Sequence, residues 1–201
     1  MVYGSTLDMT TTVEGIDLVH DETVLNIVRT ALFAALMGAF AYVAFPYPLS
    51  PAPVTLQVLG VFLAGIMLGP IWGSLAMLLY VFAGALGAPV FSMGTAGIGA
   101  IVSEQGGYLL AFPIAAFVIG WVTHGGRSPT DPHDRHPIRL LAAMVAGVVI
   151  IYLFGVIGMM VVLSLSVEEA LIMGALVFVP AEILKIAAAL GIVRSDRLAA
   201  R

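Results

Sequence analysis

The stretch at residues 138–163, IRLLAAMVAGVVIIYLFGVIGMMVVL, decides the class of protein to which this chain belongs. Arg139, at its second position, is its only charged residue. About 20 consecutive apolar residues are enough for a helix to cross the hydrocarbon core of a membrane. This stretch exceeds that length, and it therefore predicts a membrane-spanning helix.

The composition extends this prediction to the whole chain. Of its 201 residues, 61% are hydrophobic and 10% are charged, whereas soluble proteins have about 45–50% apolar and about 25% charged residues. The mean hydropathy is +1.09. A soluble domain of this size needs more polar residues to cover its surface. We therefore expect an all-α, polytopic protein of the cell membrane that is surrounded by lipid.

Further apolar runs predict more membrane-spanning helices. Proline-rich sequence between Pro46 and Pro53 ends the first run, because proline fixes φ and lacks an N–H group. Gly69-Pro70 is the expected break in the long run at 54–91, with one long kinked helix as the alternative. Pro180 suits the first turn of a helix, so we place a short helix at 168–178 before the last span. The predicted spans are 24–45, 56–68, 71–86, 108–122, 138–163 and 180–193, with a glycine-rich loop at 87–107 and a polar loop at 124–137.

The basic residues predict how these spans are oriented. If the chain starts inside and crosses six times, all eight basic residues except Lys185 fall in inside segments. These are Arg29, Arg127, Arg135, Arg139, Arg194, Arg197 and Arg201. The outside segments 46–53, 88–106 and 164–179 contain neither Lys nor Arg. Because cytoplasmic loops carry an excess of basic residues, we expect six spans with both termini in the cytoplasm.

The ends of the chain are expected to lie outside the membrane. Residues 1–23 contain acidic side chains and lack the apolar core of a signal peptide. The acidic residues are Asp8, Glu14, Asp17, Asp21 and Glu22. We expect an acidic, disordered cytoplasmic tail at 1–23, a single six-helix membrane domain at 24–194 and a short cytoplasmic tail at 195–201.

Several function classes are excluded or disfavoured by the composition. The chain has no Cys, which excludes disulfides, thiolate metal sites and a Cys nucleophile. Its few scattered arginines give no footprint for nucleic acid. A metal site is disfavoured, because the polar loop that holds the histidines and aspartates is rich in proline. These residues are His124, Asp131, His133, Asp134 and His136. We expect no metal, no resident cofactor and no enzymatic activity, since no nucleophile is paired with a base.

A charged pair lies in the last predicted span. Lys185 is the only basic residue deep in an apolar run, and Glu182 precedes it by three positions. This spacing places both side chains on one face of a helix. Charges inside a membrane face the interior of a bundle or a watery cavity. The pair is therefore either an ion pair that fixes helix packing or a ligand site with a cation beside an anion. In a ligand site, Lys185 would attract a carboxylate and Glu182 would accept N–H donors.

Six short segments are spread along the chain: LSPAPVTLQ (49–57), LAGIMLGP (63–70), LLY (78–80), GAPVF (87–91), GGYLLAFP (106–113) and VPAEILK (179–185). Together they resemble the BioY family, the biotin-binding S components of energy-coupling factor (ECF) transporters. The resemblance runs from about residue 32 to residue 189 and implies a six-helix S-component bundle that binds biotin with high affinity from outside. It also implies a transmembrane T component and two ATPases as partners. The chain has no Gly-x-x-x-x-Gly-Lys-Ser/Thr loop, so ATP hydrolysis would belong to those partners.

The resemblance also suggests which residues contact biotin. Gln57 offers a donor and an acceptor to a ureido ring, and Phe91 offers apolar contact. Thr55 is either a ligand contact or a helix cap, and Tyr80 and Tyr108 are either cavity residues or anchors at the membrane interface. The candidate substrate-binding residues are Lys185, Glu182, Gln57, Thr55, Tyr80, Tyr108, Phe91 and Gln105.

This chain departs from the pattern of the family at three places. Glu182 stands where the family usually has Asp, so the acceptor reaches one methylene further. Ser103-Glu104-Gln105 replaces a common Gly-Pro-Thr. The third external loop lacks the Arg found in some members, which leaves Lys185 as the basic candidate for the ligand.

Two further features carry expectations about transport. Ala31, Ala35 and Ala39 recur every four residues in the first span, and small residues at this spacing allow helices to approach closely. They serve either packing within the bundle or, as the resemblance implies, docking on the T component. The glycines of the loop at 87–107 suggest either a flexible connector or a mobile lid over the ligand.

Three alternative functions remain open at this point. The chain could be an S component for another small vitamin, such as thiamine or riboflavin, although Lys185 disfavours a cationic substrate. It could be a membrane protein with a purely structural or assembly role, in which the charged pair serves packing only. An intramembrane hydrolase is disfavoured by the missing nucleophile.

Overall fold

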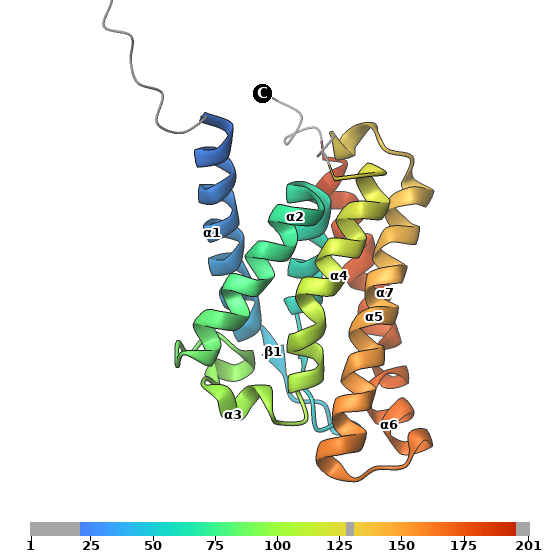
Figure 1. Cartoon of the computed structure of the whole chain (residues 1–201). Coiled ribbons are helices and arrows are strands. Elements are labelled where there is room, and N and C mark those ends of the chain that lie inside the picture. Colours follow the sequence, from blue (N-terminus) through green and yellow to red (C-terminus); the bar gives the residue numbers. More distant parts are fainter. Residues whose placement is uncertain (1–20, 128–130, 196–201) are drawn as a thin grey trace, which may run out of the picture.

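A computed structural model of the chain describes residues 21–127 and 131–195, most of which lie in helices (Figure 1). The predicted tails lie largely outside these residues. Helix α1 begins at Asp21, so residues 21–23, which the sequence analysis assigned to the acidic tail, belong to the first helix.

The elements follow one another as helices joined by short connections. They are α1 (Asp21–Tyr42), β1 (Ala44–Phe45), β2 (Val54–Thr55), α2 (Gln57–Ala85), η1 (Ser92–Gly94), α3 (Ile98–Ile101), α4 (Gly106–His124), η2 (Pro132–Asp134), α5 (Pro137–Leu163), α6 (Val167–Gly174), η3 (Leu176–Phe178) and α7 (Val179–Val193), where η denotes a 3-10 helix. The all-α prediction is confirmed in outline. A small departure is the antiparallel pairing of β1 with β2, which the sequence analysis did not predict.

Helix α2 consists of two antiparallel halves that meet at Gly69-Pro70. Gly69 has φ 78° and ψ −178°, far from helical values, and Pro70 suits the start of a new helix. A Cβ atom on Gly73 would lie 2.7 Å from the carbonyl oxygen of Ala64, whereas nine residues of continuous helix span about 13 Å. The chain therefore reverses here, as predicted, and the alternative of one long kinked helix is wrong.

The reversal leaves a backbone carbonyl that a residue of α4 satisfies. In a continuous helix the carbonyl of Ile66 would accept from the N–H group of residue 70, but Pro70 has none. The Nε2 atom of His124 lies 2.9 Å from this carbonyl oxygen. Because a carbonyl oxygen only accepts, Nε2 donates the hydrogen bond. The expectation that His124 belongs to the polar loop is wrong, since this residue is buried at the end of α4.

The six predicted spans are present. Five helical stretches of the described residues are long and apolar enough to cross a membrane, and one of them is α2. Since α2 is folded into two halves, the spans are α1, the two halves of α2, α4, α5 and α7. The short helix predicted at 168–178 is α6 followed by η3.

Glycines allow the central helices to pack closely. A Cβ atom on Gly65 would lie 2.7 Å from the carbonyl oxygen of Ala116, and a Cβ on Gly107 would clash with the backbone of Phe154. In this way α4 packs against α2 on one side and α5 on the other. Gly73, in the second half of α2, sits at an equally close contact with the first half.

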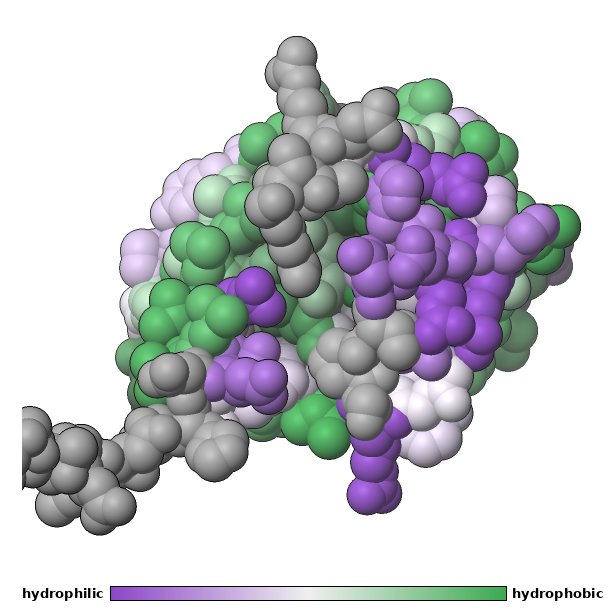
Figure 2. Space-filling view, turned by 90° about the horizontal axis from the view of Figure 1, so that it is seen from above, coloured by the Kyte–Doolittle hydropathy of each residue, from purple (hydrophilic) through white to green (hydrophobic). Residues whose placement is uncertain are grey.

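The two ends of the bundle differ in character. The start of α1, the connection from α4 to α5 and the end of α7 lie at the upper end in Figure 1, and the β1–β2 connection, α3 and α6 lie at the lower end. Seen from above, hydrophilic residues gather over part of the upper end, with hydrophobic residues around them (Figure 2). At this end the side chain of Arg139 donates to the carbonyl of Val122 (2.6 Å). Arg139, in the first turn of α5, thus caps the end of α4.

We expect His124→Leu to destabilise the fold, because it leaves the Ile66 carbonyl buried without its donor. The loss should be about 1–3 kcal/mol, seen as a lower midpoint of thermal unfolding of the detergent-purified protein. His124→Gln, which keeps an N–H donor, should lose less.

Thr123→Val is the matched control. Thr123 is the neighbouring buried residue, and among the described residues its hydroxyl has no hydrogen-bond partner. This variant should unfold at or above the wild-type midpoint. Equal midpoints for His124→Leu and wild type would contradict the role of His124.

Candidate functional site

A cavity opens between the helices near the β1–β2 connection and the start of α4. In Figure 1 these elements lie at the lower end of the bundle, away from the connection between α4 and α5. Including the part that is open to solvent, the empty space in it measures about 490 Å³. Its apolar wall includes Val58, Leu109, Phe112 and Phe178. The polar residues that line it are Thr55, Gln57, Ser92, Gln105, Tyr108, Tyr152 and Lys185.

The structure brings most of the candidate binding residues to this cavity. Thr55, Gln57, Gln105, Tyr108 and Lys185 line it, although they come from β2, α2, the loop before α4, α4 and α7. The other candidates do not line it: Glu182, Tyr80 and Phe91 lie behind the lining residues. These three contact lining residues or their neighbours, as described below.

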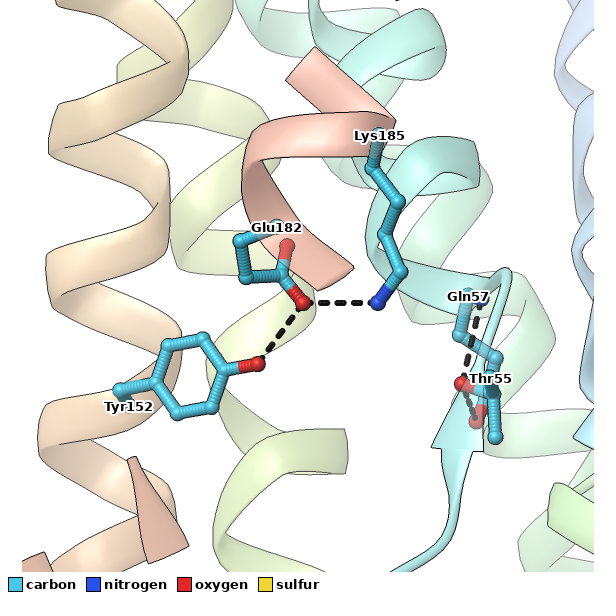
Figure 3. A network of polar contacts seen from close by, with 5 residues as sticks. All are labelled: Thr55, Gln57, Tyr152, Glu182 and Lys185. Carbon is cyan, nitrogen blue, oxygen red and sulfur yellow. Dashed lines mark hydrogen bonds and ion pairs between the residues drawn. The ribbon is translucent and has the colours of Figure 1, made fainter. Parts of the chain in front are cut away.

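The charged pair predicted in the last span is a buried ion pair. Lys185 Nζ lies 2.7 Å from Glu182 Oε1, and the two residues are only 6% and 3% exposed. Pro180 occupies the first turn of α7, so the pair sits one to two turns into the helix. Lys185 reaches the cavity, whereas Glu182 holds its ammonium from the side (Figure 3).

Tyr152 is a site residue that the sequence analysis missed. Its hydroxyl donates to Glu182 Oε1 (2.8 Å), the same oxygen that Lys185 contacts (Figure 3). Its ring stacks on Phe178 (centroids 5.9 Å apart, 27° between planes). A signal was present, since Tyr152 is the only polar side chain after Arg139 in the apolar stretch 138–163.

A second polar group lies on the wall formed by β2 and α2 (Figure 3). Thr55 Oγ1 donates to Gln57 Oε1 (3.0 Å), and Gln57 Nε2 donates to the hydroxyl of Tyr80 (2.7 Å). Thr55 Oγ1 also accepts from the backbone N–H of Gln57 (3.2 Å). Tyr80 and Gln57 lie in opposite halves of α2, so this bond joins the halves at their far ends. The group orients the Gln57 amide beside the cavity.

Phe91 supports this second group from behind. Its ring meets Tyr80 edge-to-face, with centroids 5.5 Å apart. It packs directly on Gly84, where a Cβ atom would clash with the ring. Phe91 and Tyr80 are each about 1% exposed. The sequence-based alternative that Tyr80 anchors the membrane interface is wrong, because its hydroxyl is buried and bonded to Gln57.

Tyr108 is held in the cavity wall by its hydroxyl. This group donates to the carbonyl of Gly174 at the end of α6 (2.6 Å), and the ring meets Tyr152 edge-to-face with centroids 5.9 Å apart. The hydroxyl also lies 3.8 Å from the sulfur of Met159. Tyr108 therefore ties α4 to α5 and α6, and it does not serve as an interface anchor.

The cavity retains unused hydrogen-bonding groups. Among the described residues, Lys185 uses one N–H on Glu182, so two of its three donors remain. Gln57 Nε2 uses one of its two N–H groups. The buried hydroxyl of Ser92 and Glu182 Oε2 have no partner within the described part of the chain. The site thus presents N–H donors close to a carboxylate, between aromatic and aliphatic walls.

The three alanines of α1 face away from the bundle. Ala31, Ala35 and Ala39 are all exposed, whereas Met37 and Ala41 on the other face of α1 are fully buried. Packing within the bundle is therefore not their role in this structure. They form a narrow strip of small side chains on the outside of α1.

The polar loop shows no metal-ligand cluster among the residues that the structure describes. Two of its candidate ligands serve the backbone instead. Asp131 Oδ1 accepts from the N–H of His133 (2.9 Å), and His136 Nδ1 accepts from the N–H of Ile138 at the start of α5 (3.3 Å). Both contacts are turn or helix caps.

The family model of the BioY family matches residues 9–201. The chain belongs to the BioY family. A probable biotin transporter BioY of Pyrococcus horikoshii is 38% identical to this BioY protein over 168 residues, which cover 84% of this chain and 92% of the relative. The biotin transporter BioY of Rhizobium etli is 35% identical over 175 residues, covering 83% and 90% of the two chains. This BioY protein is accordingly a multi-pass protein of the cell membrane.

A crystal structure of the S-component for biotin from an ECF-type ABC transporter has the same fold. Its TM-score is 0.80 with 24% sequence identity, and the match covers 91% of this chain and 95% of the other. The predicted S-component bundle is thereby confirmed as the fold of this BioY protein.

Proposed function

We propose that this BioY protein is the high-affinity, biotin-binding transmembrane subunit of a biotin uptake system. The observation that carries the proposal is the cavity with a buried ammonium and carboxylate at one side and the Gln57 amide at the other. Such a cavity suits a small ligand with both hydrogen-bond donors and acceptors. Membership of the BioY family and relatives named biotin transporters support biotin as that ligand.

The parts of biotin match the parts of the cavity. Its ureido ring has two N–H donors and a carbonyl acceptor, its thioether ring and side chain are apolar, and its carboxylate is an anion. The apolar parts would lie against Phe112, Phe178 and Leu109. Gln105, in the loop before α4, and Thr55 would contact the ligand from the lower end of the cavity.

The ion pair favours the ureido ring as the partner of Lys185. The sequence alone suggests the carboxylate of biotin, because Lys185 is the basic candidate. In the structure, however, Glu182 already balances its charge at 2.7 Å. A neutral acceptor fits such a pair without adding a second buried anion. The ureido carbonyl would accept from Lys185 Nζ, whose charge Glu182 balances from behind the cavity wall.

Release of biotin into the cell needs partner subunits. The chain contains no phosphate-binding loop of the Gly-x-x-x-x-Gly-Lys-Ser/Thr type, so we assign ATP hydrolysis to two ATPase subunits and the coupling to a transmembrane T component. Tight binding by itself opposes delivery, and only a partner that prefers another state of the protein can shift the balance. The protein itself is a binding and transport subunit without enzymatic activity or a resident cofactor.

The exposed strip Ala31, Ala35 and Ala39 on α1 is the proposed docking site for the T component. Small side chains on a lipid-facing helix let a partner helix approach closely. The basic upper end would face the cytoplasm by the positive-inside rule, together with residues 1–20 and 195–201. The cavity then opens toward the outside, where biotin is captured.

The segment 87–97 is the proposed lid. It carries Ser92 at the cavity, and Gly87, Gly94 and Gly97 have positive φ values. Phe91 packs it on α2, and Tyr42 of α1 donates to the carbonyl of Pro89 (2.5 Å). Val90 lies against Gly38 of α1. For biotin to enter or leave, this segment would have to separate from α1.

We expect Lys185→Ala to weaken biotin binding by well over tenfold, because a charge-assisted hydrogen bond in a dry site is lost. Calorimetry of the detergent-purified proteins with biotin measures this. Thiamine and riboflavin, titrated in parallel, should not bind to the wild-type protein. The amide of biotin, which lacks the carboxylate, should bind to the wild-type protein with the same affinity as biotin.

Glu168→Ala, on the exposed part of α6, is the control and should bind biotin normally. Unchanged affinity of Lys185→Ala would refute the role of Lys185. Binding of thiamine or riboflavin in place of biotin would assign another vitamin, and a large loss with the biotin amide alone would assign the carboxylate to Lys185.

We expect Ala35→Leu to bind biotin normally but to fail in assembly with the T component. The larger side chain would hold the partner helix away from α1. Co-purification of the coexpressed subunits measures assembly. Ala142→Leu, an equally exposed alanine on α5, should assemble normally, and normal yield for Ala35→Leu would count against this docking face.

We expect a disulfide between Gly38→Cys and Val90→Cys to trap biotin. A Cβ atom on Gly38 would lie 3.4 Å from the Cβ of Val90, close to the roughly 3.5–4.5 Å of disulfides, and the chain has no other Cys. The oxidised protein should release radiolabelled biotin at least tenfold more slowly, and reductant should restore the rate. Each single Cys variant is a control, and an unchanged rate in the oxidised pair would exclude the lid.

A further inference from the structure

Glu182 is held by two donors that both line the cavity, although Glu182 itself does not line it. Tyr152 and Lys185 contact the same oxygen, Oε1, at 2.8 and 2.7 Å. The second oxygen, Oε2, is buried and has no partner among the described residues. The direction of the carboxylate is therefore decided by the balance between a lysine on its own helix and a tyrosine on α5 (Figure 3).

The hydroxyl of Tyr152 has a fixed position. Its ring is stacked on Phe178 and meets Tyr108 edge-to-face, each with centroids 5.9 Å apart. Tyr108 is in turn anchored to the carbonyl of Gly174 at 2.6 Å. An aromatic cluster from α4, α5 and η3 thus presents one hydroxyl to the carboxylate of Glu182. This cluster holds the carboxylate in place, so the flexible side chain of Lys185 does not have to.

The length of the Glu182 side chain matters for this contact. Glu182 and Lys185 are three residues apart on one helix and would meet with a shorter acid as well. Tyr152 belongs to another helix, so the side chain of residue 182 has to span the gap between α7 and α5 to reach its hydroxyl. An aspartate would fall short of it by about one methylene, roughly 1.5 Å, which is enough to break a hydrogen bond.

We propose that Tyr152 is a positioning residue for ligand selectivity: its hydroxyl holds the Glu182 carboxylate so that Lys185 keeps one N–H on Glu182 and turns its remaining donors to the ligand. Glu182 and Tyr152 are matched in length, because a glutamate at position 182 reaches the tyrosine hydroxyl and the shorter aspartate does not. Tyr152 acts on the ligand through Glu182. The proposal rests on the proposed function, because biotin is the ligand used to test it.

The test is a double-mutant cycle between Tyr152→Phe and Glu182→Asp, with biotin affinity as the readout. Tyr152→Phe removes one oxygen and keeps the ring and its stacking. We expect each single variant to weaken biotin binding by about tenfold, since each removes a hydrogen bond to a charged group. The double variant should be no weaker than either single variant, because both remove the same bond.

Tyr80→Phe is the matched control for the cycle. It also removes a buried tyrosine hydroxyl beside the cavity, but one that accepts from Gln57 and does not contact Glu182. Its effect, whatever its size, should add to that of Glu182→Asp. Additive losses for Tyr152→Phe and Glu182→Asp would overturn the positioning role, since they indicate that the tyrosine acts independently of the acid.

Selectivity gives a second readout that a merely structural role would not change. If Tyr152 positions the pair, Tyr152→Phe and Glu182→Asp should both reduce the preference for biotin over its iminobiotin analogue, in which the ureido carbonyl is replaced, and by the same factor. An unchanged preference in either variant would overturn the proposal. If Tyr152→Phe fails to fold, wild-type affinity of Glu182→Asp would overturn it as well. Absence of biotin binding by the wild-type protein would instead refute the proposed function.

Discussion

A lysine ammonium buried between membrane-spanning helices must be balanced by other groups of the protein, and this constraint organises the lower half of the bundle. Lys185 has only Glu182 as an ionic partner among the described residues, at 2.7 Å. The carboxylate is itself buried and needs a second donor, which Tyr152 supplies from α5. A charge on α7 therefore fixes the register of α7 against α5, and the aromatic cluster around Tyr152 becomes part of the same arrangement.

The other constraint is the reversal of the chain at Gly69-Pro70. It brings the start and the end of α2 together, so that Gln57 reaches Tyr80 and the second wall of the cavity is formed. The same reversal leaves the Ile66 carbonyl without its helical donor, and His124 of α4 replaces it. A polar contact at one end of the bundle thus secures the geometry of the binding wall at the other.

The sequence predicted a large part of this structure because the signals involved are local. The break at Gly69-Pro70 and the helix start at Pro180 follow from the backbone chemistry of proline and glycine. The pairing of Glu182 with Lys185 follows from their spacing on one helix. His124 was placed wrongly because its partner is a carbonyl on another helix, which leaves no trace in the neighbouring sequence. For the same reason, the sequence did not decide whether Tyr80 and Tyr108 face the cavity or anchor the membrane interface.

What the sequence by itself determined is the membrane character of the protein, its six spans and the presence of two opposite charges on one face of the last span. Length, hydropathy and spacing along one helix are enough for these features. What only the tertiary structure decided is which side chains face the cavity: Tyr152 reaches it, whereas Tyr80 and Phe91 lie behind its wall. The physical reason is that helices in a membrane are apolar on their lipid-facing and their buried sides alike, so the hydrophobic pattern does not mark the inner face. Instead, glycines and buried polar contacts set how the helices pack, and this packing decides which face of each helix points inward.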